Sequence, residues 1–214
     1  MMSTIPFLLP LLGACLMGGE IVFPEGLEPL ETNTAPWPQP ERGDPYPETL
    51  SLVSGETDTY AWTHGRGYLH ATVEEAWDSL QDPEVVTDRR GVDAWSVTLE
   101  AEEGYDVAFS VHNEVYDIIT VEFDIAWREG AVAGSFEDPQ AVGVRFLKVA
   151  GTNLIDLMEG SVTLYEVDDT LTAIELIEHL DAYSTGTAET EAWMTDLFAS
   201  VVARVAGDPL PTYD

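Results

Sequence analysis

The chain has 214 residues and carries 40 acidic side chains against 8 basic ones, which gives a formal net charge of −32. This excess of negative charge repels phosphates, so the composition excludes a nucleic-acid-binding protein and disfavours attraction to anionic lipid head groups. The sequence contains no run of about 18 or more apolar residues, which a membrane-spanning helix would need. The length suits one domain with a tail.

The acidic excess has two interpretations. One is a heavily solvated surface. The other is adaptation to a saline environment, where a short Debye length screens the repulsion between like charges. We favour the second, halophilic interpretation, which predicts that the fold becomes more stable as the salt concentration rises.

A short apolar run, from Ile5 to Leu12, opens the chain and is typical of a signal-peptide core. It leads into Leu12-Gly13-Ala14-Cys15, which resembles the lipobox of bacterial lipoproteins. The resemblance implies that residues 1–14 are a signal peptide, that the chain is cleaved before Cys15, and that this thiol carries lipid. The alternative is an apolar N-terminal tail with a spare thiol.

Cys15 is the one cysteine of the chain, so no disulfide framework competes for it. It is followed by Leu16 rather than by aspartate. By resemblance to the usual sorting pattern, this predicts a protein of the cell envelope, anchored through lipid in an outer membrane or at the cell surface.

Residues 15–48 are expected to form a proline-rich linker. Proline at high density prevents helix formation and favours polyproline II, in which some 30 residues reach on the order of 90 Å. We expect a spacer that holds a folded domain away from the membrane; the alternative is an arm that packs back on the domain through Phe23 and Trp37. Seven of the 13 prolines lie here: Pro24, Pro29, Pro36, Pro38, Pro40, Pro45 and Pro47.

The folded domain is expected over residues 49–214. A strand is predicted within Thr59–His70, and Thr72 with Glu75 forms a capping box that begins a short helix. That helix ends at Asp82-Pro83, and a second short turn can follow it.

Alternating apolar residues then predict antiparallel strands with one buried face. Acidic and glycine-containing turns are expected at 102–104 and 128–130, and a hairpin turn at 168–169. A long amphipathic helix, Thr187–Gly207, ends the pattern. The predicted strands are Trp95–Leu99, Tyr105–Val111, Ile119–Trp127, Val142–Val149, Leu154–Met158, Ser161–Val167 and Leu171–Tyr183.

The order of these elements resembles the START/Bet v 1-like (SRPBCC) superfamily, which includes the polyketide cyclase-like proteins. The local resemblance is the stretch Glu74–Pro83, an acidic turn followed by tryptophan, leucine and Asp-Pro. The resemblance implies an α+β helix-grip fold, in which a curved antiparallel sheet wraps around the C-terminal helix. It also implies an apolar cavity between the sheet and that helix.

The apolar faces predict where such a cavity would lie. A packed core is the alternative, since most apolar faces are packed, whereas large aromatic side chains on a curved sheet also line ligand sites. The residues expected to line the cavity are Trp95, Phe109, Phe123, Trp127, Phe146, Trp193, Leu197 and Val201. Three of these, Trp193, Leu197 and Val201, are expected to form its floor.

The sequence shows no nucleophile elbow, phosphate loop or zinc spacing, so we expect no catalytic set, no metal and no cofactor. The favoured function is a monomeric, surface-tethered lipoprotein that binds an apolar small molecule or lipid without catalysis. One alternative is a cyclase or aromatase in which His112, His179 or Arg145 does acid–base work. Another is a structural lipoprotein with a filled core.

Overall fold

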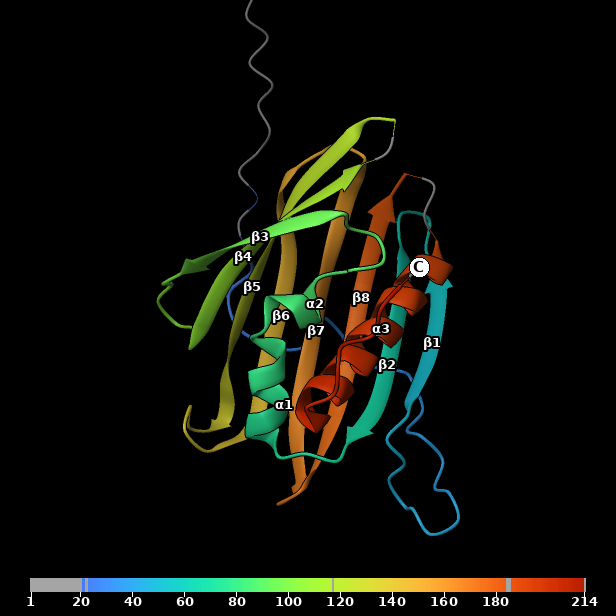
Figure 1. The fold of residues 1–214 in the computed structure, drawn as a ribbon, viewed down its shortest axis with the longest axis vertical. Coiled ribbons are helices and arrows are strands. Elements are labelled where there is room, and N and C mark those ends of the chain that lie inside the picture. The colour runs from blue at the N-terminus through green and yellow to red at the C-terminus, as the bar shows by residue number, and fades with distance from the viewer. Residues whose placement is uncertain (1–20, 22, 117, 184–185, 214) are drawn as a thin grey trace, which may run out of the picture.

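The computed structural model describes residues 21, 23–116, 118–183 and 186–213. Within them, eight antiparallel strands form one sheet in the order β1-β2-β8-β7-β6-β5-β4-β3, and three helices lie on its concave side (Figure 1). The strands are β1 (Leu50–Glu56), β2 (Ala61–Leu69), β3 (Ala94–Glu100), β4 (Val107–Tyr116), β5 (Thr120–Gly134), β6 (Pro139–Gly151), β7 (Ile155–Asp168) and β8 (Leu171–Ala182). The helices are α1 (Val73–Leu80), α2 (Pro83–Val86) and α3 (Thr187–Ala206).

The short helices form where local signals predicted them. Thr72 and Glu75 make the reciprocal bonds of a capping box at the start of α1. Asp82 caps α2, whose first residue is Pro83. Helix α3 ends at Gly207, which adopts φ 72°, a left-handed conformation that glycine enters without a steric penalty.

Helix α3 crosses the concave face of the sheet and buries one side. Trp193, Met194, Leu197, Phe198 and Val201 are buried there. At the N-terminus of α3, the carboxylate of Glu189 accepts a hydrogen bond from the Gly186 N–H at 2.8 Å. The predicted α+β helix-grip architecture, with a curved sheet around the last helix, is confirmed.

The sheet differs from the prediction in four places. Its first strand, β1, was not predicted. The strands predicted at 154–158 and 161–167 are one continuous strand, β7. The turn predicted at 128–130 lies inside β5, which continues to Gly134. The apolar residues Val97 and Leu99 of β3 are 38% and 82% exposed, because β3 is an edge strand that extends beyond the helices.

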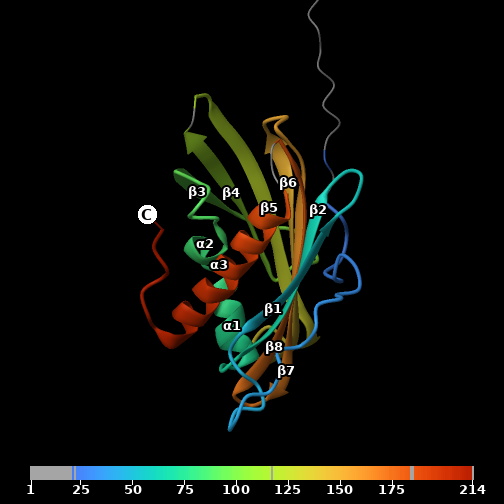
Figure 2. The same ribbon diagram turned by 90° about the vertical axis from the view of Figure 1, so that its right-hand side faces the viewer.

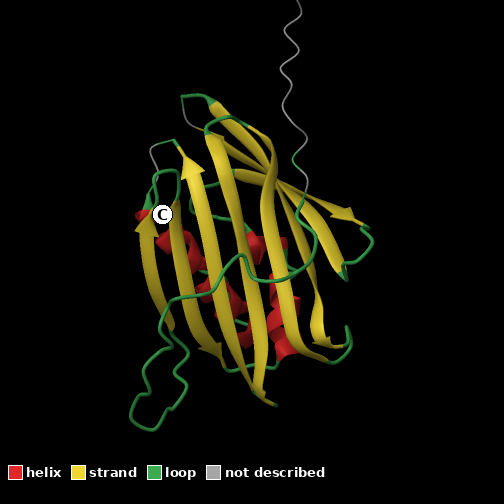
Figure 3. Ribbon diagram, turned by 180° about the vertical axis from the view of Figure 1, so that it is seen from behind, coloured by secondary structure: helices red, strands yellow, loops and turns green. Residues whose placement is uncertain are grey.

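The proline-rich segment covers the convex face of the sheet, on the side opposite the helices (Figures 2 and 3). It crosses the strands in spatial order: Phe23 lies over Arg128 of β5, Glu28 O accepts from Arg145 of β6, and Leu30 N donates to Ser161 of β7. We call residues 23–48 the strap.

Beyond Leu30 the strap continues over β8 and β2. Asn33 is 5% exposed, and its side-chain amide donates to Leu176 O of β8 and Gly65 O of β2, both at 3.0 Å. Trp37 then stacks on Tyr68. Over its described length the segment is therefore not a free spacer, and the structure corrects that expectation in favour of the packed arm. The domain division at residue 49 stays a prediction.

Among the residues that the structure describes, no helix has both the length and the apolar character needed to cross a membrane. The expected signal peptide, residues 1–14, and the lipid-attachment residue Cys15 lie outside the described residues.

Candidate functional site

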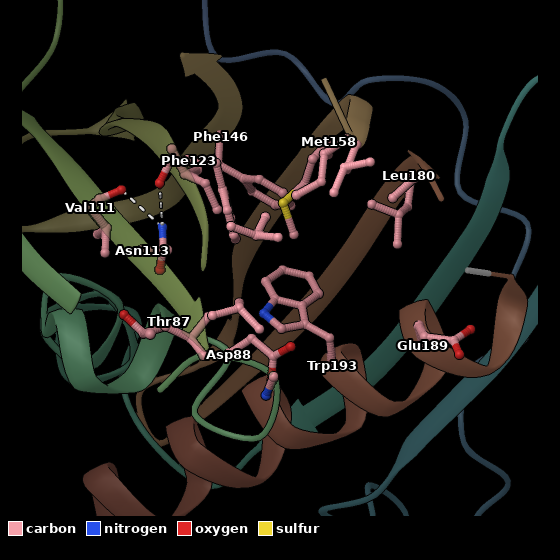
Figure 4. Close-up of a pocket in the computed structure, with 18 of the residues that line it drawn as sticks. Thr87, Asp88, Val111, Asn113, Phe123, Phe146, Met158, Leu180, Glu189 and Trp193 are labelled. Atoms are coloured by element: carbon pink, nitrogen blue, oxygen red, sulfur yellow. Dashed lines mark hydrogen bonds between the residues drawn. The ribbon is translucent and has the colours of Figure 1, made fainter. Parts of the chain in front are cut away.

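A cavity of about 330 Å³ lies between the concave face of the sheet and α3 (Figure 4). Its lining comes from the loop that follows α2, from β4 to β8 and from the first turns of α3. Several lining residues at one end are exposed, among them Leu154, Tyr183 and Glu189. The opening therefore lies where the β6–β7 loop, the segment after β8 and the start of α3 meet.

Aromatic rings form one wall of the cavity. Trp127 stacks on Phe146 with ring centroids 4.7 Å apart, and Phe146 meets Trp193 edge to face at 5.2 Å. Gly160 of β7 makes room for this arrangement, because a Cβ at that position would collide with the Phe146 ring. The wall therefore depends on one strand position that lacks a side chain.

Few polar side chains line the cavity, and they lie mainly on one side. Asp88 follows α2, and its Oδ1 accepts the N–H groups of Arg90 and Gly91 at 3.1 Å. Burial raises the pKa of Asp88 above its usual value, against the opposing effect of these two bonds. Thr87 is 7% exposed, and its Oγ1 has no hydrogen-bond partner within the described part of the chain.

Asn113 of β4 is also part of the lining. Its side-chain amide donates to Val111 O at 3.0 Å and to Phe123 O at 3.4 Å, as the dashed lines in Figure 4 show. These bonds fix the side chain against the sheet. The fourth polar group, Glu189, lies at the opening.

Besides those of Asp88 and Glu189, a further carboxyl group lies near the cavity without lining it. Glu178 belongs to the same face of β8 as the lining residues Leu180 and Ala182, and it is fully buried. Among the described residues, neither of its carboxyl oxygens has a hydrogen-bond partner. Burial raises the pKa of Glu178 well above its usual value, and the nearby charge of Asp88 raises it further. Both effects favour the neutral, protonated form of Glu178.

Four of the eight residues predicted to line a cavity do so: Phe123, Trp127, Phe146 and Trp193. The structure places the other four outside the lining. Phe109 is 1% exposed and stacks behind Trp127, with centroids 6.0 Å apart. Trp95 is partly buried and packs against the core from the edge strand.

Leu197 and Val201 are buried in the packed core further along α3. The floor predicted from Trp193, Leu197 and Val201 is thus formed by Trp193 alone. The apolar stripe of a helix does not show how far along its length a cavity extends, which is why the sequence-based expectation failed at these two residues.

The three side chains named for acid–base work all lie on the convex face. His112 is half exposed, and its Nδ1 is 2.6 Å from Asp124 Oδ1. Arg145 and His179 lie beneath the strap, where they contact Glu28 and Glu31. They alternate with the lining residues Asn113, Phe146 and Leu180 along their strands, so they point away from the cavity.

Sequence reasoning missed the carboxyl groups near the cavity. Glu178 alternates in phase with the buried Leu176 and Leu180 of β8, and this phase was a signal that it points inward. No comparable signal marks Thr87 and Asp88, because they lie in an irregular segment whose position depends on long-range packing.

A second group of titratable residues, Glu31, His64, His179 and Glu159, lies between the strap and the sheet; we call it the strap cluster. The first three could each offer a ligand atom, and these atoms lie within 4.8 Å of one another. Their hydrogen bonds already use the ring nitrogens. Thr34 N donates to His64 Nδ1 at 3.0 Å, which leaves the ring proton on Nε2, where it meets Glu31 Oε1 at 2.8 Å.

His179 lies between two carboxylates, with Nδ1 3.2 Å from Glu159 and Nε2 3.4 Å from Glu31. Burial by itself would lower the pKa of His179, but these two hydrogen bonds outweigh it and raise the pKa. The ring stacks on Tyr60 with centroids 4.6 Å apart. What this geometry supports is attachment of the strap to β2 and β8.

No family model matches the chain, and no curated protein matches its sequence. Solved structures match its fold. Human StAR-related lipid transfer protein 5 is 12% identical, with a TM-score of 0.53 over 76% of this chain and 84% of that one. The lipid transfer and protein localization domain of human StarD13 (DLC2) is 10% identical, with a TM-score of 0.50 over 74% and 83%.

The Zhui aromatase/cyclase from Streptomyces sp. R1128 is 12% identical, with a TM-score of 0.43 over 74% of this chain and 93% of that one. At these identities the similarity is one of fold. The superposition covers about three quarters of this chain in each of the two human proteins, at TM-scores of 0.50 and 0.53. The chain therefore has the START/Bet v 1-like helix-grip fold.

Proposed function

We propose that this protein binds an apolar small molecule or lipid in the cavity between the sheet and α3, without catalysing a reaction. The observation that carries the proposal is the aromatic wall of Trp127, Phe146 and Trp193 around a space of about 330 Å³. That volume is at the lower end of the range for small-molecule sites, roughly 300–1,000 Å³, and such sites are mostly apolar with a few polar groups.

The fold supports this proposal. The two human START proteins that share it are named for lipid transfer, and a cavity between sheet and helix is the place where this chain could hold a comparable ligand. The filled-core alternative fits poorly with the open space beside Trp193. The cyclase alternative is weakened, because the three side chains named for its acid–base work, His112, His179 and Arg145, point away from the cavity.

Anchoring at the cell envelope through Cys15 is part of the proposal. It rests on the apolar run and the Leu12-Gly13-Ala14-Cys15 stretch that follows it. Replacing Cys15→Ser should release the protein from the membrane fraction of the producing cell. Membrane association of the variant equal to that of the unaltered protein would contradict the anchor.

The binding proposal is tested with N-phenyl-1-naphthylamine, a neutral apolar dye that fluoresces in apolar sites. The protein should increase the fluorescence of the dye with saturable binding. Val121→Trp should abolish this increase, because Val121 lines the cavity and a tryptophan there fills it. Val167→Trp is the matched control, since Val167 is 40% exposed at the end of β7. Equal dye binding by the two variants would contradict the proposal.

A further inference from the structure

The charged residues around the cavity all have one sign. Asp88 and Glu189 line it, and of the described lining residues none is lysine, arginine or histidine. The guanidinium of Arg90, next to the lining residue Gly91 in the sequence, is committed elsewhere, since it forms a bidentate pair with Asp196, with both bonds at 2.8 Å. An anionic ligand group entering this space would therefore meet negative charge and find no cation to offset its desolvation.

The polar groups that remain available are suited to a hydrogen-bond donor. A carboxylate oxygen accepts hydrogen bonds, and only one oxygen of Asp88 is held by the backbone of its own turn. The other oxygen of Asp88 is left for a ligand, since no hydrogen bond to it is formed within that turn. In Figure 4 the side chain of Asp88 is drawn next to Trp193, and both residues line the cavity.

The aromatic wall adds to this preference. Faces of tryptophan attract cations, with a free energy of about 0.5–2 kcal/mol depending on how far the pair is desolvated. Trp193 lines the cavity, whereas Trp127 is stacked between Phe109 and Phe146 and contributes its edge. The indole of Trp193 is therefore the one that could attract a cationic group beside Asp88.

We propose that the ligand is an amphiphile with an apolar body and a hydrogen-bond-donating, cationic polar end such as an amine, which Asp88 binds directly. This inference rests on the proposed function and narrows it. A ligand with a carboxylate or phosphate end is disfavoured by the same residues. The apolar body occupies the space between Trp193 and Phe123, and the polar end meets the loop after α2.

Three probes of equal chain length separate the possibilities: decylamine, decanol and decanoate, each used to displace N-phenyl-1-naphthylamine from the full chain at pH 7. Decylamine should displace the dye at the lowest concentration and decanoate at the highest, with at least about a tenfold difference between them. Displacement from the cavity is the readout, so amine that collects on the acidic surface is not counted.

The variant Asp88→Asn tests the assigned residue. Asparagine keeps an oxygen that can accept the N–H groups of Arg90 and Gly91, so the turn should persist. The variant should weaken decylamine binding about fivefold or more and leave decanol binding unchanged. Asp78→Asn, an exposed position on α1, is the matched control and should change neither.

The outcomes distinguish the two proposals. If decanol displaces the dye but decanoate binds as tightly as decylamine, the cationic ligand class is wrong while the cavity remains a binding site. If decylamine binds most tightly and Asp88→Asn has no effect, the assignment to Asp88 is wrong. If the dye does not bind, or no probe displaces it, the proposed function itself is wrong.

Discussion

The indole Nε1 of Trp77 donates a 2.7 Å hydrogen bond to Oε2 of Glu129, and both side chains are buried between α1 and the sheet. Trp77 is the tryptophan of the acidic-turn stretch that resembles the START/Bet v 1-like superfamily. Glu129 belongs to β5, in phase with Ile125 and Trp127. Burial raises the pKa of Glu129 from 4.5 to about 8, although the bond from Trp77 acts in the opposite direction.

We expect Glu129→Gln to stabilise the protein above pH 8. A carboxyl group with a raised folded-state pKa contributes stability that is fully present below pH 4.5 and is lost as the pH rises through about 8. A shift of this size corresponds to a loss of up to about 5 kcal/mol at high pH. The amide does not ionise, so urea unfolding from pH 4.5 to 9 should show a flatter profile for the variant.

Glu122→Gln is the matched control for this experiment, because Glu122 lies on the same strand with an exposed side chain. It should leave the pH profile unchanged. A Glu129→Gln variant whose free energy of unfolding falls as steeply with pH as that of the unaltered protein would show that Glu129 is already ionised in the fold.

The strap should be held most firmly at mildly acidic pH, between about 4.5 and 6.5. The raised pKa of His179 provides stability that is present below about pH 6.5 and is lost as the pH rises through the folded-state value. For Glu31, burial would raise the pKa, but hydrogen bonds from His64 and His179 outweigh it and lower the pKa. Its contribution is therefore lost as the pH falls through that lowered value.

Three groups face the imidazole ring of His179: Glu31 from the strap, Glu159 from β7, and Tyr60, which stacks on it. Arg145 lies near Glu159. Histidine ring resonances, followed by NMR across pH 5–9, give the pKa of His179 directly. A value above about 6.5 is expected, and a value at or below it would contradict the charged ring between two carboxylates.

Asn33→Ala should loosen the strap. The substitution removes two buried hydrogen bonds, to Leu176 O and Gly65 O, and the acceptor of the Ala35 N–H. Each lost hydrogen bond costs about 0.5–1.5 kcal/mol. Proteolysis within residues 23–48 should accelerate by at least tenfold relative to Gln39→Ala, an exposed amide of the same segment. Equal cleavage rates would show that Asn33 does not fasten it.

Gly160→Ala should destabilise the aromatic wall. The new methyl group would collide with the Phe146 ring and would lie 2.5 Å from Ile177 O. Overpacking of this kind costs about 1–3 kcal/mol. The double variant Gly160→Ala with Phe146→Leu should recover part of that loss, because leucine vacates the contested space. Strictly additive losses in thermal unfolding would argue against the steric account.

The melting temperature should rise between 50 mM and 2 M NaCl. A net charge of −32 destabilises the compact state through self-repulsion. A high salt concentration shortens the Debye length and so screens that repulsion. Potassium chloride should act in the same way at equal ionic strength. A melting temperature that is flat or falls with salt would contradict the halophilic interpretation.

Elements fixed by neighbours in the sequence were predictable, and contacts across the fold were not. The Thr72–Glu75 capping box and the end of α3 at Gly207 depend on a few adjacent residues. The central strands followed from alternation, but Gly160 was misread as a break because a glycine can also make space within a continuous strand. Glu129 was assigned to a turn since nothing local marks a buried, protonated glutamate.

The path of the strap could not be predicted from the sequence. Polyproline-type composition predicts an extended backbone correctly but does not say whether it is free or packed. Its packing depends on single side chains with distant partners, such as Asn33 with Leu176, 143 residues apart. Only half of the residues predicted to line the cavity do so. The curvature of the sheet decides which inward residues face open space, and the alternation of apolar residues does not reveal that curvature.

The packed strap also shortens the connection between the domain and its proposed anchor. Phe23 lies against Arg128, so the seven residues between Cys15 and Phe23 remain to span the distance to the lipid, at most about 29 Å from Cys15 to Phe23 at full extension. A lipidated protein of this design would keep its cavity within one protein diameter of the bilayer. The short connection would then allow an apolar ligand to be transferred at the membrane surface, without passing through bulk water.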